Sequence, residues 1–136
     1  MRKSLAIVLL LILSSCANGK CPFARHTAQV NHVVLCWLKE PGNEAQRQHL
    51  IDASYGFAKI PGVLSITAGK AIPSTRPVVD SSFDVAIVIA FTDEAALHAY
   101  DQNPIHKKAV SDVLRPLTAK LLIYDVKRGE ASPTPR

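Results

Sequence analysis

The sequence predicts an α+β protein in which helices cover one face of a single antiparallel sheet. Four apolar, β-prone segments alternate with two amphipathic helical regions, and Gly, Pro or a capping residue marks each change of period. The chain has 136 residues, 48% of them hydrophobic and 20% charged. That length and composition are typical of one globular domain.

Residues 30–38 are nearly all apolar, which predicts a strand buried on both faces. A Pro-Gly pair at 41–42 ends this strand, and Asn43 is a suitable cap for the helix that follows. One apolar stripe at helical spacing then extends to the Pro-Gly pair at 61–62, where we expect the helix to end. The stripe consists of Leu50, Ala53, Phe57 and Ile60.

Residues 63–68 form the second predicted strand, which Gly69 closes. Residues 70–82 are rich in Pro, Ser and Thr and predict a loop, and residues 83–91 predict a third, very apolar strand.

The remaining part of the domain contains a broken helix and the last strand. Thr92 or Asp93 is expected to cap the helical region. Asn103 and Pro104 interrupt it, because Asn is a good cap and Pro a good first helical residue. Residues 121–126 predict the final strand.

The order β-α-β-β-α-β is that of the ferredoxin-like fold, whose helices cover only one face of the sheet. The first strand, however, is apolar on both faces, with Val33, Leu35 and Trp37 alternating with Val34, Cys36 and Leu38. A second copy of the chain is the simplest cover for the free face. The sequence therefore predicts a homodimer, with a monomer bearing an apolar sheet as the alternative.

The N-terminal residues predict export and a lipid anchor. Arg2 and Lys3 precede a run of nine apolar residues, which is too short to span a bilayer and is typical of a signal peptide over residues 1–15. Residues 13–16 (LSSC) resemble a bacterial lipobox, in which Cys16 is lipidated. Ala17 lacks the acidic character linked with inner-membrane retention, so we expect a lipoprotein of the outer membrane that faces the periplasm. The alternative is an ordinary signal peptide.

Composition separates a tether, residues 16–29 including the lipidated cysteine, from a domain at 30–126 and a flexible tail at 127–136. In an oxidising compartment, Cys36 is either paired with Cys21 or a buried free thiol.

Charge and motifs exclude several classes of function. The formal net charge is +5, with no block of five or six like charges, which argues against nucleic-acid binding. Neither a Cys/His cluster with zinc spacing nor a Gly-rich phosphate loop occurs, so we expect no metal and no other cofactor. His26, His49 and His98 are interpreted as solvated, as is the basic group Lys107, Lys108 and Arg115.

Several segments resemble the stress-responsive A/B barrel (Dabb) domain, in order and with the spacing of that family. They are residues 32–39 (HVVLCWLK), 60–63 (IPGV), 83–86 (FDVA) and 91–97 (FTDEAAL), with Tyr100 and residues 103–106 (NPIH). The last of these resembles the family's His-Pro-x-His motif, with Asn103 in place of the first histidine. The resemblance implies a dimeric α/β barrel and says little about activity.

One group of relatives, the plant polyketide cyclases, has a cavity between sheet and helices. The resemblance places its catalytic histidine at His106, the assisting tyrosine at Tyr100 and a further cavity histidine at His32. Two other polar cavity residues fall at Val85 and Ala53, so this cavity is expected to be more apolar.

The residues themselves support two interpretations of this group. His106 shares a helical stripe with Val110, Val113 and Leu117, so we expect it to point inward. His32, Tyr100 and His106 form either a satisfied core network or a catalytic site with His106 as acid and base. The first interpretation predicts a small-molecule-binding or stress-related module, with or without a small apolar ligand. The second predicts a cyclase- or monooxygenase-like enzyme for an aromatic or polyketide-like substrate.

Overall fold

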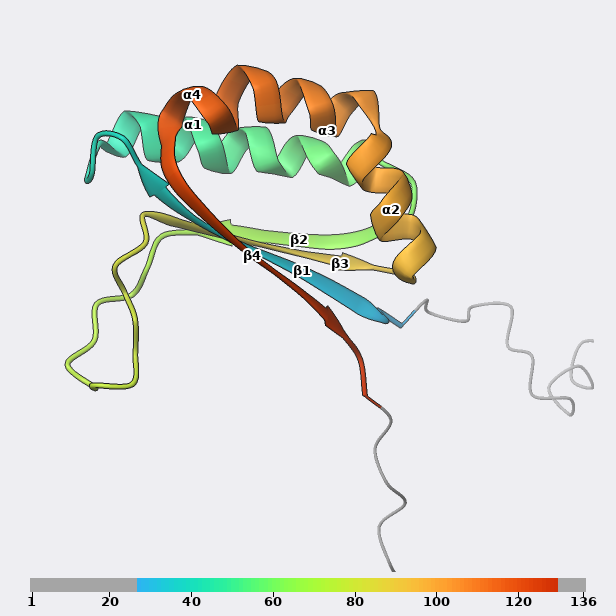
Figure 1. Cartoon of the computed structure of the whole chain (residues 1–136), viewed down its shortest axis with the longest axis horizontal. Coiled ribbons are helices and arrows are strands. Elements are labelled where there is room, and N and C mark those ends of the chain that lie inside the picture. Colours follow the sequence, from blue (N-terminus) through green and yellow to red (C-terminus); the bar gives the residue numbers. More distant parts are fainter. Residues whose placement is uncertain (1–26, 130–136) are drawn as a thin grey trace, which may run out of the picture.

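The computed structural model describes residues 27–129. Figure 1 shows helices over one face of a four-stranded antiparallel sheet, whose strand order is β2-β3-β1-β4. This is the predicted ferredoxin-like arrangement. The predicted signal peptide, Cys16, Cys21, most of the tether and nearly all of the tail lie outside the described residues. Within residues 27–129, no helix is long and apolar enough to cross a membrane.

The first helix begins where the sequence predicts but is shorter than expected. β1 (Val30–Leu38) leads into α1 (Glu44–Tyr55), and the Asn43 side chain caps the helix by accepting a hydrogen bond from the backbone N–H of Gln46 at 3.0 Å. The chain then tightens into the 3-10 helix η1 (Gly56–Lys59). Pro61 explains why this segment ends at Lys59, since a proline disfavours helical geometry at the preceding residue, and Ile60 is extended.

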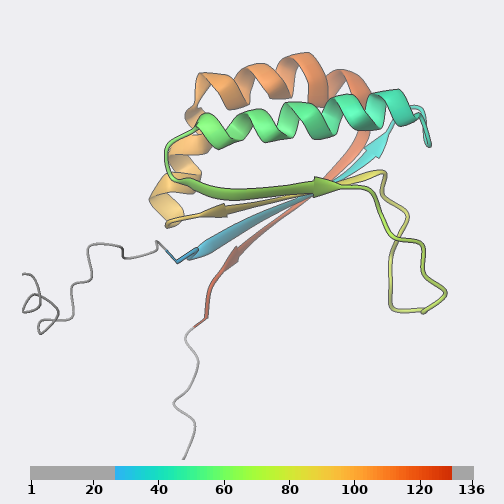
Figure 2. The same cartoon turned by 180° about the vertical axis from the view of Figure 1, so that it is seen from behind.

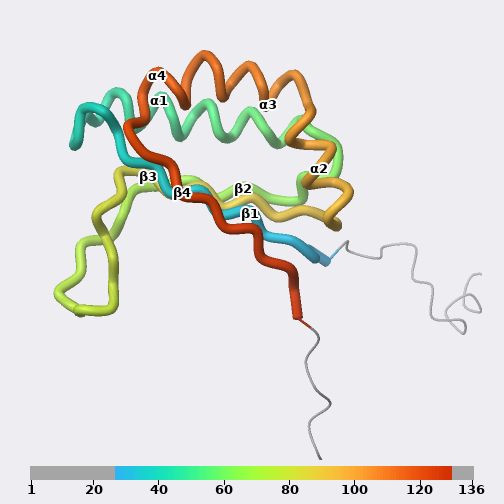
Figure 3. Tube along the Cα trace, in the orientation of Figure 1, coloured from blue at the N-terminus to red at the C-terminus, as the bar shows by residue number. Residues whose placement is uncertain are grey.

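The sheet brings together chain segments that are far apart in the sequence (Figure 3). β2 (Val63–Gly69) and β3 (Val85–Phe91) are antiparallel neighbours, and β1 lies between β3 and β4 (Thr118–Lys127). β4 begins earlier than the sequence predicts, because Thr118 already pairs with Leu38 across a bulge. β3 begins later than predicted, at Val85.

Asp84 explains the later start of β3. Its carboxylate accepts hydrogen bonds from the backbone N–H groups of Leu38 at 2.9 Å and Gly42 at 3.1 Å, and it contacts the Arg47 guanidinium at 3.3 Å. Burial by itself would raise the pKa of Asp84, but these donors outweigh it and hold the pKa below its ordinary value. The residue therefore ties the end of β1 to α1.

The second helical region is divided into several short pieces. Asp93 caps α2 (Glu94–Gln102), and Asn103 caps α3 (Pro104–Ala109), as the sequence predicts. A π-helical turn, η2 (Val110–Leu114), and the short α4 (Arg115–Leu117) follow. Pro116 favours the π turn because it has no N–H to continue the helical ladder.

The π turn corrects the predicted stripe along this region. Because it changes the phase of the helix, the buried residue here is Leu114. The predicted members Val110, Val113 and Leu117 are only half-buried.

The two faces of the sheet have different surroundings (Figure 2). On the helix face, Val34, Cys36, Val85 and Ile87 are buried under the helices. On the opposite face, which we call the open face, Val33, Leu35 and Trp37 are only half-buried. The register adds to the open face further residues of the neighbouring strands, namely Ala86, Val88, Leu122, Tyr124 and Val126. The helix face of β1 is therefore buried as predicted, whereas its apolar open face is only half-buried in the single chain.

Candidate functional site

His32, Tyr100 and His106 come together at one end of the layer between sheet and helices. His32 lies on the helix face of β1, Tyr100 near the end of α2 and His106 in the first turn of α3. The ring centroids of His32 and Tyr100 are 5.9 Å apart, and those of Tyr100 and His106 are 4.3 Å apart with a tilt of 36°. The cap at Asn103 makes this possible, because it turns the chain between the two helices within one residue.

Aromatic packing fills the space around Tyr100. The rings of Phe57 and Phe91 meet Tyr100 edge-on, with centroids at 5.4 and 5.1 Å, and Phe57 also meets His106 at 5.8 Å. Tyr100 is 1% exposed, and burial, with a smaller effect of Asp101, raises the pKa of its hydroxyl. Edge-on contacts of this kind stabilise a packed core.

Asp125 is a partner of His32 that the sequence analysis missed. Its carboxylate Oδ1 lies 2.6 Å from His32 Nδ1, and the two residues are opposite each other on β4 and β1. In the neutral ring, Nδ1–H donates to this carboxylate and Nε2 keeps its lone pair. The sequence indicates this pair only through the alternation of side chains along β4. That alternation identifies Asp125 as the partner only when the register between β4 and β1 is known.

His106 has a similar arrangement with a backbone partner. Its Nδ1 lies 3.3 Å from the carbonyl oxygen of Asp101, which can only accept a hydrogen bond. Burial is the largest influence on its pKa and lowers it below the ordinary value, although Asp101 acts in the opposite direction. A neutral ring with Nδ1–H bonded to the carbonyl presents Nε2 as a base.

One side of His106 reaches a shallow groove along the outside of the helices. The groove has a volume of about 260 Å³, and its rim includes Lys107, Ser111 and Arg115. Neither His32 nor Tyr100 lines it. The chemistry available here is proton transfer by one half-buried imidazole.

The remaining residues that the sequence analysis singled out lie either in the core or on the surface. Val85 is fully buried and Ala53 is half-buried, so the two cavity positions at which the cyclases are polar are apolar here. His49 and His98 are exposed, as are Lys107, Lys108 and Arg115. Cys36 is a buried free thiol, and burial raises its pKa to about 12. Among residues 27–129, no group of three or more His, Cys, Asp or Glu side chains is placed to hold a metal ion.

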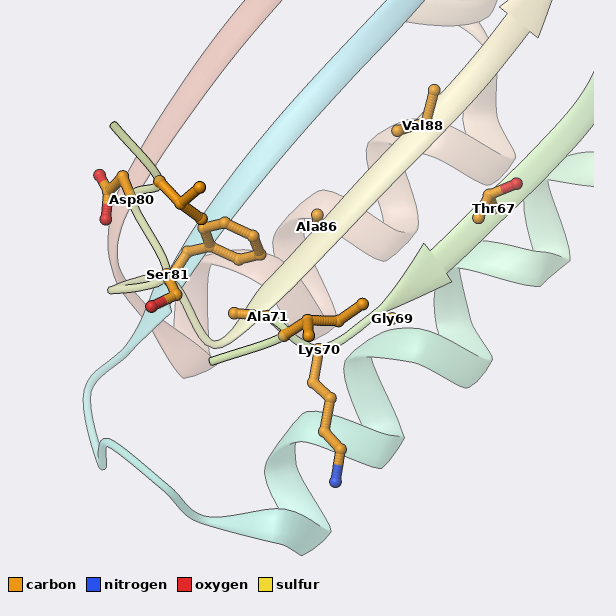
Figure 4. Close-up of a pocket in the computed structure, with 11 residues that line it drawn as sticks. Thr67, Gly69, Lys70, Ala71, Asp80, Ser81, Ala86 and Val88 are labelled. Atoms are coloured by element: carbon orange, nitrogen blue, oxygen red, sulfur yellow. The ribbon is translucent and has the colours of Figure 1, made fainter. Parts of the chain in front are cut away.

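A second pocket lies on the open face, where the sequence analysis placed no site (Figure 4). It has a volume of about 360 Å³ and lies between the sheet and the segment that joins β2 to β3, which we call the 70–84 loop. Thr67, Gly69, Ala86 and Val88 of the strands form its floor. The loop supplies the rest of its lining, which includes Lys70, Ile72, Asp80 and Phe83.

Trp37 anchors the end of this loop to the sheet. Its indole Nε1–H donates to Ser82 Oγ at 3.1 Å, and Phe83 meets its ring edge-on at 6.5 Å. The ammonium group of Lys120 lies over the same ring, 4.2 Å from the centroid. The sequence predicted a loop here but contained no signal for where it lies.

Comparison with known proteins agrees with this fold. The sequence profile of the stress responsive A/B barrel domain matches residues 30–128. No curated protein matches the chain.

Several solved structures are similar, at identities that show the fold alone. A Dabb family protein with a ferredoxin-like fold from Mesorhizobium loti is 23% identical, with a TM-score of 0.62, and the match covers 76% of this chain and 100% of that one. A dimeric ferredoxin-like protein of unknown function from Thermobifida fusca is 20% identical, with a TM-score of 0.60 and coverage of 74% and 92%. A hydroxynitrile lyase from Passiflora edulis is 20% identical, with a TM-score of 0.59 and coverage of 78% and 98%. The profile match spans most of the chain, which therefore belongs to the stress responsive A/B barrel domain family.

Proposed function

We propose that this chain is a homodimeric small-molecule-binding protein whose two copies pack through the open faces of their sheets. The observation that carries the proposal is the open face itself. It combines an apolar centre with a ligand-sized pocket at one end.

The chemistry of the open face supports a second copy as its cover. Its central residues are apolar, and Tyr124 and Val126 at its edge are 51% and 50% exposed. Contiguous apolar surfaces of this kind mark interfaces. The Thermobifida fusca structure of the same fold is dimeric. Two packed sheets of four strands would give the barrel that the sequence analysis expects.

The pocket on the open face supports a small, mainly apolar ligand. Its volume of about 360 Å³ lies within the range of about 300–1,000 Å³ that ligand pockets occupy. Its floor is apolar apart from the Thr67 hydroxyl, and Lys70 and Asp80 bring charges to its rim. A second copy on the open face would shield this pocket from water.

Native mass spectrometry of the full chain in mild detergent tests both parts of the proposal. We expect a dimer and additional mass from a small molecule. Leu35→Asp should give monomers, while Ala45→Asp on the exposed side of α1 should not. Ala86→Leu fills the pocket and should remove the ligand, whereas Ala119→Leu, which lies outside it, should retain the ligand. A wild-type monomer would overturn the dimer, and an empty wild-type dimer would overturn the binding role.

We also propose that the protein is exported and held in the outer membrane, facing the periplasm, by a lipid on Cys16. The support is the lipobox-like sequence at residues 13–16. We expect incorporation of labelled palmitate, which Cys16→Ser should abolish and Cys21→Ser should retain. Recovery of the unlabelled protein in the soluble periplasmic fraction would refute the anchor.

A second candidate function is acid-base catalysis on an aromatic or polyketide-like compound. The geometry of His106 favours it, because its Nδ1 has the Asp101 carbonyl as an acceptor, which leaves Nε2 as a base, and the residue lines the groove beside the helices. His106 would remove a proton from a carbon between two carbonyl groups of the substrate. Tyr100, which packs against the His106 ring, would orient that ring. General-base catalysis contributes roughly 10²–10⁴-fold to a rate.

Deuterium exchange into a β-diketone, followed by NMR, tests this candidate without a known substrate. The wild type should accelerate exchange at the carbon between the carbonyls. His106→Gln should lose this acceleration, while Lys107→Gln on the same turn should keep it. Equal rates for wild type and His106→Gln would remove the catalytic role and leave the histidine a core residue.

A further inference from the structure

The 70–84 loop is longer than its connection requires. β2 and β3 are antiparallel neighbours, and Gly69 at the end of β2 pairs with Ala86. Such neighbours are commonly joined by about two to five residues. Long loops without secondary structure in a compact domain usually have a function of their own.

The loop projects on the side of the sheet away from the helices (Figures 1 and 2). It is held in place rather than loose, because Ser82 bonds Trp37 and a turn is closed by the Val79 N–H and the Arg76 carbonyl at 3.0 Å. Two of its apolar side chains nevertheless contact little of their own chain, since Ile72 is 84% and Val78 89% exposed. They are more exposed than any other large apolar side chain in the described part of the chain.

The edge strand β4 has a matching exposed surface. Leu121 pairs with Cys36 and Ile123 with Val34, so both lie on the helix face of the sheet. They are nevertheless 37% and 50% exposed, because the helices do not cover this edge. A second copy packed on the open face would cover the other side of β4 and leave these two side chains in water. Covering them requires a segment that passes around the edge.

The loop of a second copy is placed to do this. β2 and β4 are the two edges of the sheet, so a two-fold axis parallel to the strands would set β2 of one copy opposite β4 of the other. The loop begins at β2. Roughly seven residues outward at about 3.3 Å each give a reach of about 23 Å, and packed sheets are only about 10 Å apart.

We propose that the 70–84 loop of each copy passes around the β4 edge of the other copy and packs Ile72 and Val78 on Leu121 and Ile123. This inference rests on the proposed homodimer and specifies a contact between the two copies. The loop then forms one wall of the pocket on the open face while its Ile72 and Val78 side chains hold the partner, so ligand binding and dimer affinity are coupled.

Dimer affinity of the full chain in mild detergent tests the contact. Ile72→Asp with Val78→Asp places four buried charges in each dimer, because the two-fold symmetry repeats every substitution. We expect the dissociation constant to rise at least about 100-fold, which corresponds to about 2.8 kcal/mol. Thr75→Asp, at the exposed tip of the same loop, should change it less than about threefold, or about 0.7 kcal/mol.

Disulfide trapping tests the partner surface directly. In a Cys21→Ser background, Val78→Cys with Ile123→Cys should give a covalent dimer on a non-reducing gel. Val78→Cys with Tyr124→Cys, on the opposite side of β4, should give far less. A wild-type dimer that neither weakens with the aspartates nor forms the covalent link would refute the loop contact and leave the homodimer standing. A wild-type monomer would refute both.

Discussion

Replacing Gly62 with alanine should destabilise the fold for two separable reasons. Gly62 has a φ of 88°, in the left-handed region. A Cβ at this position would lie 2.5 Å from the Cβ of Ala96, which is well inside van der Waals contact. The glycine is therefore the point at which the turn before β2 lies directly against α2.

The two costs can be estimated from the geometry. The left-handed conformation costs a non-glycine residue about 1–2 kcal/mol, and overpacking a filled site costs about 1–3 kcal/mol. Gly62→Ala should thus lower the free energy of unfolding by about 2–5 kcal/mol in total. Gly42 provides a matched control because its φ is 79° and a Cβ there would meet nothing within 4 Å. Gly42→Ala should show only the first cost.

Urea unfolding of the full chain, followed by far-ultraviolet circular dichroism, measures these differences. Protein concentration must be held constant, because the stability of a dimer depends on it. Ala96→Gly removes the clashing atom, so adding it to Gly62→Ala should recover the overpacking cost. The cost of the left-handed conformation should remain, together with about 1 kcal/mol for a glycine in a helix. Equal losses for Gly62→Ala and Gly42→Ala, with no coupling between Gly62→Ala and Ala96→Gly, would refute the close contact.

Three further predictions concern buried polar groups. Asp84→Asn should lower the free energy of unfolding by about 1–3 kcal/mol, because the donors around it lose a charged acceptor, while the exposed Asp80→Asn should have little effect in the same urea titration. The pKa of Asp84 is lowered by folding, so its contribution is present above its unfolded pKa and lost as pH falls through the folded value, and Asp84→Asn should flatten the acid limb of a stability-pH profile. Folding also lowers the pKa of His106, so its protonation should destabilise the protein as pH falls below the ordinary value of 6.5. His106→Gln should remove that part of the pH dependence, and a stability-pH profile unchanged by the substitution would contradict the burial of His106. The buried thiol of Cys36, with its pKa raised to about 12, should resist iodoacetamide in the folded protein and react in urea, as quantified by mass spectrometry.

Local chemistry explains most of what the sequence determined about this protein. The order of strands and helices follows from apolar periodicity and from Pro-Gly pairs at the element ends. The caps Asn43, Asp93 and Asn103 were identifiable because a cap depends on residues only two or three positions away. The alternation of β1 placed His32 on the helix face, and the family motif brought Tyr100 and His106 to it.

Tertiary structure alone decided the features that depend on strand register and on packing between distant segments. Asp125 meets His32 only because β4 pairs with β1 in one register, and a shift by one residue would turn the carboxylate to the other face. The pocket on the open face exists because the 70–84 loop lies against Trp37, and no pattern in the sequence indicates this contact. Periodicity reports which face a side chain occupies. Its partner on that face is determined by long-range hydrogen bonding and packing, which leave no repeating pattern along the chain.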